Sequence, residues 1–384
     1  MLLMDGFKRT VKFGEPIISE EEIQDVIKVL QSGWLTHGPK TEEFEKVFSE
    51  YIGTKYAVAV SSCTAALHLS LMALGIGAGD EVIVPAQTHV ATAHSAEFVG
   101  AKPVFADVDI ATGTITAETI KSKLTKNTKA INVVHFAGQP CEMDDIRSLC
   151  ESKGIFIVED CAHSLGSVYK GKKTGNIGNT GCYSFYPIKQ ITTCEGGMLT
   201  TNDQRVAMLA SKQRGFGIDK AVQERKIAGY YDVPYLGYNY RMTEVEAAIG
   251  IIQMKKLPAM NNSRIENANY LISLIKNIPG INYSKESSEI VNTHFFFQLK
   301  LEKKYPTSRN DLAKKFTEQG IGTSIYYATP LHLMTYYRQK YGYKKGDLVN
   351  AELIADTTIA LPIGPHVLKG DLELMAQIIS ENSK

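Results

Sequence analysis

The sequence predicts an α/β fold, with a mostly parallel sheet in a large domain and a smaller α+β domain at the C-terminus. The chain has 384 residues, more than one hydrophobic core usually holds. From about residue 14 to residue 254, short apolar runs alternate with amphipathic stretches, a pattern typical of a parallel sheet covered by helices. After Leu257 this alternation stops. We therefore expect a large domain over residues 1–255, including an N-terminal arm, and a small domain over 256–384.

The expected elements follow the chain in order. A first helix is predicted in EEEIQDVIKVLQSG, where Ile23, Ile27 and Leu30 share one face and Gly33 supplies a stop. The predicted strands of the large domain span 56–60, 81–85, 102–108, 130–136, 155–160 and 182–186, and its clearest later helices are TAALHLSLMAL and MDDIRSLCESKG. In the small domain we expect a long helix over 261–278, strands at 294–301 and 322–327, and the helix RNDLAKKFTEQG between these strands.

Composition argues against several classes of function. A net charge of +1 provides no electrostatic attraction to nucleic acid or to a membrane. The N-terminal residues do not resemble a signal peptide, and no apolar run approaches the length of about 18 residues that a membrane helix needs. The six cysteines are scattered, without a C-x-x-C pair. This spacing predicts reduced thiols in a cytoplasmic protein, and no metal site.

Two motifs follow predicted strands, at the edge where open α/β sheets bind their ligands. In AVAVSSCTAALHL, a strand ends at Val60 and a helix begins near Thr64, so the free N–H groups of that helix could bind a phosphate. A plain helix cap by Ser62 or Thr64 is the alternative. In IFIVEDCAHSLGS, Asp160 stands where a buried strand emerges, and a carboxylate there needs a cationic or hydrogen-bonding partner. A helix cap is again the alternative, and a functional role for His163 depends on Asp160.

A third motif, CYSFYPIKQITTCEGG, holds a single lysine, Lys189, among aromatic, hydroxylic and glycine residues. Apolar surroundings lower the pKa of a lysine, and its neutral amine can form a Schiff base. A solvated loop lysine is the alternative. Together with the hydroxyl of Ser184, the three motifs match pyridoxal phosphate, which needs partners for its phosphate, its aldehyde and its ring nitrogen.

Several longer stretches resemble the sugar aminotransferases of the DegT/DnrJ/EryC1/StrS family, which have the fold of type I pyridoxal phosphate enzymes such as aspartate aminotransferase. The resemblance covers nearly the whole chain and includes VIVPAQTHVATAHS, HFAGQPCEMDDI, VEDCAHSLGSVYKGKKTG and GYNYRMTEVEAAIG. It implies an enzyme that moves an amino group from an amino acid, L-glutamate in much of the family, to a keto sugar. Pyridoxal phosphate would be the cofactor and pyridoxamine phosphate its intermediate form.

By this resemblance, Lys189 matches the Schiff-base lysine and Asp160 matches the partner of the ring nitrogen, so both are expected to be catalytic. The other expected cofactor contacts are Cys63, Thr64, Ala65 and Ser184 at the phosphate, His89 on the ring face, His163 near the phenolic oxygen, and Asn239 contributed by the partner subunit of a homodimer. His89 replaces a larger aromatic residue of the family. Two turns, SSCT and TTCEGG, carry cysteine where relatives have glycine, so we expect no positive φ at Cys63 or Cys194.

Other classes of function fit less well. Sugar dehydratases of the same family carry histidine in place of the lysine, so Lys189 argues against that activity. A non-catalytic relative would be expected to lose Lys189 or Asp160. The run GIGAGD follows a predicted helix and precedes a strand, which is the wrong order for a dinucleotide-binding site.

The substrate is the part that the sequence specifies least. By resemblance, Trp34, Leu35 and Thr36 in SGWLTHGPK, together with His332 in YYATPLHL, border the sugar pocket; a packed His332 is the alternative. The expected substrate is a nucleotide-linked keto sugar, used to make amino sugars for lipopolysaccharide, other surface glycans or natural products. A free keto sugar or a sugar acid is the alternative.

Overall fold

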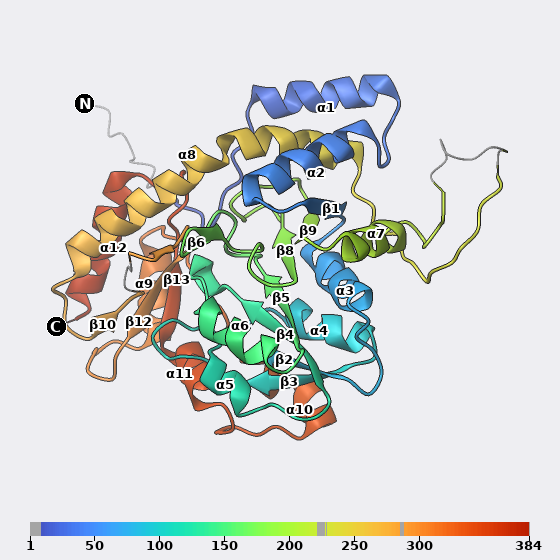
Figure 1. Ribbon diagram of the computed structural model, residues 1–384. Coiled ribbons are helices and arrows are strands. Elements are labelled where there is room, and N and C mark those ends of the chain that lie inside the picture. Colours follow the sequence, from blue (N-terminus) through green and yellow to red (C-terminus); the bar gives the residue numbers. More distant parts are fainter. Residues whose placement is uncertain (1–8, 221–226, 228, 285–287, 384) are drawn as a thin grey trace.

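A seven-stranded sheet forms the centre of the computed structural model, which describes residues 9–220, 227, 229–284 and 288–383 (Figure 1). Its order is β1-β9-β8-β5-β4-β2-β3; β9 runs antiparallel to both neighbours and the other pairs are parallel. The strands are β1 (Tyr56–Val60), β2 (Glu81–Pro85), β3 (Lys102–Ala106), β4 (Thr128–Val134), β5 (Phe156–Asp160), β8 (Thr180–Ser184) and β9 (Gly197–Thr201). The predicted α/β class with a mostly parallel sheet is therefore confirmed.

Helices cover both faces of this sheet. Side chains alternate along β2, so Val82 and Val84 pack with α3 and α4, whereas Ile83 packs with α5 and α6 on the other face. The long helix α8 runs from α1 and α2 across to α12 (Figure 1). The helices of this part are α1 (Glu20–Ser32), α2 (Pro39–Ile52), α3 (Cys63–Ala73), α4 (Val90–Phe98), α5 (Ala117–Lys121), α6 (Met143–Glu151), α7 (Gln204–Gln213) and α8 (Glu244–Ile275).

A second, smaller sheet follows in the C-terminal part, in the order β10-β12-β13, and a third joins β11, β6 and β7. The bounds of these strands are β6 (Val168–Tyr169), β7 (Lys172–Lys173), β10 (Ile281–Asn282), β11 (Ile290–Val291), β12 (Phe297–Leu301) and β13 (Thr358–Leu361). The remaining α-helices are α9 (Arg309–Glu318), α10 (Thr335–Tyr341), α11 (Val349–Thr357) and α12 (Lys369–Glu381). Within the described residues, no helix combines the length and apolarity that crossing a bilayer requires.

The division at 255/256 does not coincide with a break in the chain's structure. That position lies inside α8, which continues without interruption to Ile275. Tyr337 of α10 and Ala351 of α11 pack into the core of the large sheet, although both follow the expected boundary. In the opposite sense, Val11 pairs with Ile321 and packs into the C-terminal core. The two-domain division thus stays an interpretation, with chain segments that cross it in both directions.

One predicted strand is wrong, and one observed strand was missed. The stretch 322–327 is not a strand: Ser324 makes one isolated bridge to Ala360, and β13 supplies the strand expected there. Its apolar character serves aromatic packing instead, since Tyr326 stacks on Phe296 with ring centroids 4.7 Å apart. The antiparallel strand β9 was not predicted, because GMLTT lacks the apolar alternation of a strand.

Helix α1 forms as predicted but presents its apolar face outward. Gly33 ends the helix in the left-handed conformation, with φ 71°. Ile23, Ile27 and Leu30 are nevertheless 47%, 37% and 55% exposed. The residues that α1 buries against the body include Glu22, whose carboxylate pairs with Lys256 of α8 at 2.8 Å. The apolar face therefore lies free on the surface of the single chain.

Candidate active site

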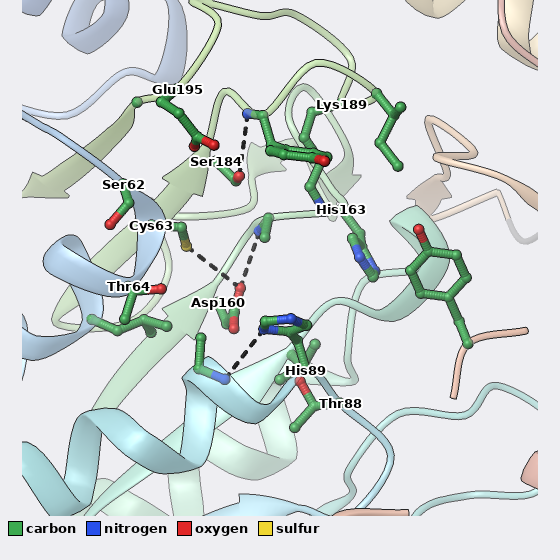
Figure 2. A pocket seen from close by; sticks show the side chains of 18 of the residues that line it. Ser62, Cys63, Thr64, Thr88, His89, Asp160, His163, Ser184, Lys189 and Glu195 are labelled. Atoms are coloured by element: carbon green, nitrogen blue, oxygen red, sulfur yellow. Dashed lines mark hydrogen bonds between the residues drawn. The ribbon is translucent and has the colours of Figure 1, made fainter. Parts of the chain in front are cut away.

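A pocket of about 360 Å³ lies at the carboxyl ends of β1, β5 and β8 (Figure 2). Residues that follow β2 and the pair Tyr326 and Tyr327 complete its wall. The strand ends meet here because parallel strands carry their carboxyl ends to one edge of the sheet. Of the residues singled out from the sequence, the pocket is lined by Cys63, Thr64, His89, Asp160, His163, Ser184 and Lys189.

Lys189 reaches the pocket from the turn after β8, and its backbone N–H donates to Tyr186 O at 2.9 Å. Its Nζ lies 4.4 Å from the centroid of the Phe295 ring. Burial among such apolar groups lowers the pKa of Lys189 to about 8, against smaller opposing effects of Cys63 and Asp160. The alternative of a solvated loop lysine does not fit this position.

Asp160 ends β5 and is 5% exposed. Its Oδ1 accepts from the Ala162 N–H at 3.1 Å and from the Cys63 thiol at 3.9 Å (Figure 2). Its Oδ2 accepts from the Thr92 hydroxyl at 2.8 Å. The carboxylate thus has the hydrogen-bonding partners that its burial demands. Thr92 was missed from the sequence; its spacing of four from Thr88 at the start of a helix was the available signal.

The first turn of α3 lies beside the pocket and leaves backbone N–H groups without intrahelical partners. The side chain of Ser62 accepts from the Ala65 N–H at 3.1 Å, so the cap considered as an alternative is present. That bond occupies Ala65, which does not line the pocket. Cys63 and Thr64 remain beside it, and Ser184 on the other side accepts from the Tyr186 N–H at 3.4 Å.

Two imidazoles face the pocket, both in the neutral form. Burial lowers the pKa of His163 well below its ordinary value, and the nearby Lys189 acts in the same direction. His163 stacks on Phe295 at 4.5 Å, and its buried Nδ1 has no hydrogen-bonding partner within the described structure. Burial also lowers the pKa of His89, whose Nδ1 accepts from the Ala91 N–H at 3.2 Å and caps α4. The neutral His89 ring therefore carries its proton on Nε2.

Comparison with known proteins shows which family the chain resembles along its length. The model of the DegT/DnrJ/EryC1/StrS aminotransferase family matches residues 16–380. The chain belongs to this family.

Individual relatives agree with this assignment. The uncharacterized protein MJ1066 of Methanocaldococcus jannaschii is 41% identical over 96% of this chain and 97% of its own length. The spore coat polysaccharide biosynthesis protein SpsC of Bacillus subtilis is 38% identical over 95% of both chains. The structure of DesV from S. venezuelae, solved in complex with a ketimine intermediate, is 31% identical and covers 95% of this chain and 94% of its own, with a TM-score of 0.88. These likenesses confirm the predicted fold of type I pyridoxal phosphate enzymes.

The pocket of this aminotransferase family member fits pyridoxal phosphate. The unpartnered Nδ1 of His163 is a buried polar atom that a ligand oxygen would satisfy. Lys189 could bind the aldehyde, Asp160 the ring nitrogen, and the first turn of α3 the phosphate, so each polar part of the cofactor has a matching group.

One turn beside the pocket contradicts an expectation. Cys63 begins α3 in helical conformation, as expected, but Cys194 has a φ of 74°, so the expectation of no positive φ is wrong there. The N–H of Cys194 donates to Thr192 Oγ1 at 3.0 Å, which closes the turn tightly. The turn geometry is therefore the same as glycine would allow, and the cysteine adopts it at an energetic cost.

Besides Ala65, five residues that were expected to bind the cofactor or the sugar do not line the pocket of the single chain. Trp34, Leu35 and Thr36 are exposed in the loop between α1 and α2. Asn239 is exposed and forms an isolated bridge with Gly215, which follows α7. His332 is fully buried and bonds Glu352 at 3.0 Å, which supports the alternative of a packed histidine.

A buried cluster of His135, Glu159 and Cys161 lies close to the site. The Glu159 carboxylate already bonds His135 Nε2 at 2.9 Å, and it also accepts from the backbone N–H groups of Gly175, Ile177 and Gly178. His135 Nδ1 accepts from the Cys141 N–H at 3.1 Å. These bonds engage the imidazole of His135 and the carboxylate of Glu159, so internal hydrogen bonding explains why the two are buried together.

Proposed function

We propose that the protein is a pyridoxal phosphate-dependent aminotransferase that moves an amino group from L-glutamate to a keto sugar. The observation that carries this proposal is the amine of Lys189, with a pKa of about 8, in the same pocket as the Asp160 carboxylate. The cofactor, when bound, supplies an electron sink for the carbon that exchanges its proton. That chemistry needs a base and a carboxylate that maintains positive charge at the ring nitrogen.

The chain's own residues would provide both. Near pH 8 about half of the Lys189 amines are neutral, so this group can take up a proton and return it. Asp160 would hold a proton at the ring nitrogen, with its orientation set by hydrogen bonds. His163 would bond the phenolic oxygen, since its Nδ1 is free in the described structure. Cys63, Thr64 and Ser184 would surround the phosphate, Ala65 would support them from the first turn of α3 with its N–H bonded to Ser62, and His89 would cover the ring.

For the acceptor we propose a nucleotide-linked keto sugar, in the synthesis of amino sugars for lipopolysaccharide, another surface glycan or a natural product. Support comes from SpsC, a relative named for spore coat polysaccharide biosynthesis. Trp34, Leu35 and Thr36 are the proposed sugar contacts, whereas the buried His332, bonded to Glu352, fits the alternative of a packed histidine. A free keto sugar or a sugar acid is the alternative.

We also propose that two copies form a cytoplasmic homodimer in which Asn239 of each completes the other's phosphate site. Asn239 is exposed and outside its own chain's pocket lining, as a residue acting across an interface would be. In the same chain segment after α7, Phe216, Tyr230 and Leu236 are 46%, 74% and 72% exposed, as expected of apolar side chains that a partner subunit covers. The cytoplasmic location is supported by six unpaired cysteines.

The test of the activity is a visible absorption spectrum of the protein with pyridoxal phosphate, before and after L-glutamate. We expect L-glutamate to replace the band of lysine-bound cofactor with that of pyridoxamine phosphate. Lys189→Ala should show neither the first band nor its replacement. A band that L-glutamate leaves unchanged would reject this donor or this reaction. A protein that never develops the band would reject the Lys189 assignment. The pyridoxamine form, offered nucleotide-linked and free keto sugars in turn, then identifies the acceptor.

A further inference from the structure

Thr92 connects the first turn of α4 to the Asp160 carboxylate. Its hydroxyl oxygen lies 2.8 Å from Asp160 Oδ2, and its side chain is fully buried. Thr92 does not line the pocket, so no ligand in the pocket would contact it. Any influence on the reaction must therefore pass through Asp160.

The direction of the hydrogen bonds at Thr92 follows from the chemistry of its neighbours. An ionised carboxylate can only accept, so Thr92 donates its one hydroxyl proton to Asp160. The bond of 2.9 Å between the hydroxyls of Thr88 and Thr92 must then run from Thr88 to Thr92. The result is a directed chain from Thr88 through Thr92 to Asp160, in buried surroundings where successive bonds strengthen one another.

The backbone of Thr92 is held in place independently of its hydroxyl. Its carbonyl oxygen accepts from Asn132 Nδ2 at 2.9 Å and from Ser95 Oγ at 2.9 Å. Asn132 belongs to β4, the strand beside β5, and Asn132, Ser95 and Thr92 are all fully buried. These bonds attach the start of α4 to the sheet that carries Asp160. The Thr92 hydroxyl is therefore a fixed point for the carboxylate.

Counting the partners of Asp160 shows what this fixed point does. A carboxylate has about four acceptor directions. Oδ1 takes the Ala162 N–H and the Cys63 thiol, and Oδ2 takes the Thr92 hydroxyl. The remaining direction lies on Oδ2, the oxygen that Thr92 holds. Any rotation of the carboxylate that turned this free acceptor direction of Oδ2 away from the pocket would also break the hydrogen bond to Thr92.

We propose that Thr92 is a positioning residue that keeps one acceptor direction of Asp160 available to the ring nitrogen of the cofactor. This inference rests on the proposed function, since it requires a ligand with a ring nitrogen in the pocket. It predicts that loss of the Thr92 hydroxyl weakens binding only of ligands that possess that nitrogen.

The test compares the full-length protein and its variants in their binding of two probes. One probe is pyridoxal phosphate, and the other is its analogue in which carbon replaces the ring nitrogen. Dissociation constants are measured by titrating the cofactor-free protein and following absorbance. Thr92→Val keeps the size of the side chain and removes the hydroxyl, so we expect about tenfold weaker binding of pyridoxal phosphate and less than twofold change for the analogue. Thr92→Ser keeps the hydroxyl and should restore the wild-type constant.

Thr200→Val is the matched control, because it removes the hydroxyl of a fully buried threonine that bonds Gly175 O and contacts neither Asp160 nor Thr92. It should change the ratio of the two dissociation constants by less than twofold. Equal weakening of both probes by Thr92→Val, or no weakening, would overturn the inference. Thr92→Ala is interpreted in the same way and replaces the valine variant if that fails to fold. A wild-type protein that binds neither probe would instead reject the proposed function.

Discussion

The amine of Lys189 lies 4.4 Å from the centroid of the Phe295 ring, so two parts of the chain meet at the expected catalytic lysine. Lys189 follows strand β8 of the large sheet, whereas Phe295 precedes β12 of the C-terminal sheet. The same ring stacks on His163, with centroids 4.5 Å apart. The ring acts on the amine in two opposite ways: it excludes water, which disfavours the ammonium, and its π face attracts the cation.

Two substitutions of Phe295 separate these effects. Phe295→Leu keeps an apolar side chain but removes the π face, so we expect the pKa of Lys189 to fall by about half a unit. Phe295→Ala admits water, and we expect the pKa to rise from about 8 towards its ordinary value. The measurement is the pH dependence of the rate at which cofactor-free protein binds pyridoxal phosphate, since only the neutral amine reacts. Midpoints that move in the same direction for both variants would contradict this account.

The three strand ends of the site could be predicted from the sequence because their signals are local. Apolar runs end at Val60 and at Val158, and each is followed at once by polar residues, which include Asp160 after the second run. Parallel pairing then brings those ends to one edge. Phe295 and Thr92 could not be assigned in this way, since their contacts depend on how distant elements pack. The sequence around each of them shows only an aromatic run and a helix start.

Strand β9 shows why other parts of the fold were not predictable. It lies between β1 and β8, although it follows both in the chain. Its insertion depends on Gly197, where a Cβ would collide with the backbone of Ser62 and Cys63. Likewise, Ile23 and Ile27 point outward because α1 turns Glu22 towards the body of the protein. An acidic side chain is rarely buried without a partner, and here Lys256 of α8 provides one. Neither arrangement follows from local periodicity.

Lys189 should lower the stability of the cofactor-free protein. Its pKa is about 8 in the folded chain and about 10.5 when unfolded, so folding penalises the ammonium form. The penalty is fully present below pH 8 and disappears as the pH rises through 10.5. We therefore expect Lys189→Met to raise the free energy of unfolding by up to about 3 kcal/mol at pH 7, and by much less at pH 10.5. Urea unfolding at the two pH values measures this, with the exposed Lys46→Met as control. An equal gain at both pH values would refute the electrostatic explanation.

Cys194 should be replaceable by glycine with a gain in stability. A left-handed conformation costs a residue with a side chain about 1–2 kcal/mol, and replacement by glycine removes this cost. Part of the stability gained is lost again, because glycine has greater conformational freedom in the unfolded chain. Since Cys194 has a φ of 74° and an exposed side chain, we expect Cys194→Gly to raise the free energy of unfolding by about 0.5–1 kcal/mol. Cys194→Ala removes the thiol but keeps the strain, and it should change little. If alanine stabilises as much as glycine, the thiol and not the backbone is responsible.

The proposed homodimer makes a prediction that does not depend on knowing its interface. Lys189→Ala and Asn239→Ala each impair activity alone. In a mixed dimer, one site would receive Lys189 from one copy and Asn239 from the other, and would be complete. Unfolding and refolding an equal mixture makes about half of the dimers mixed, so about one quarter of the wild-type activity should return.

A mixture of Lys189→Ala with Asp160→Ala is the control for this complementation. Lys189 and Asp160 line the same pocket of one chain, so every site in that mixture lacks one of them and no activity should return. Asn239 is exposed and lies outside that lining, which is why its pairing with Lys189 should differ. If the first mixture shows only the mean activity of its two components, Asn239 acts within its own chain or not at all. Activity that returns in the Lys189→Ala and Asn239→Ala mixture, but not in the control mixture, would assign Asn239 to the partner's site. Only a residue that acts across the interface can restore a site whose Lys189 belongs to the other copy, which Asp160 cannot do.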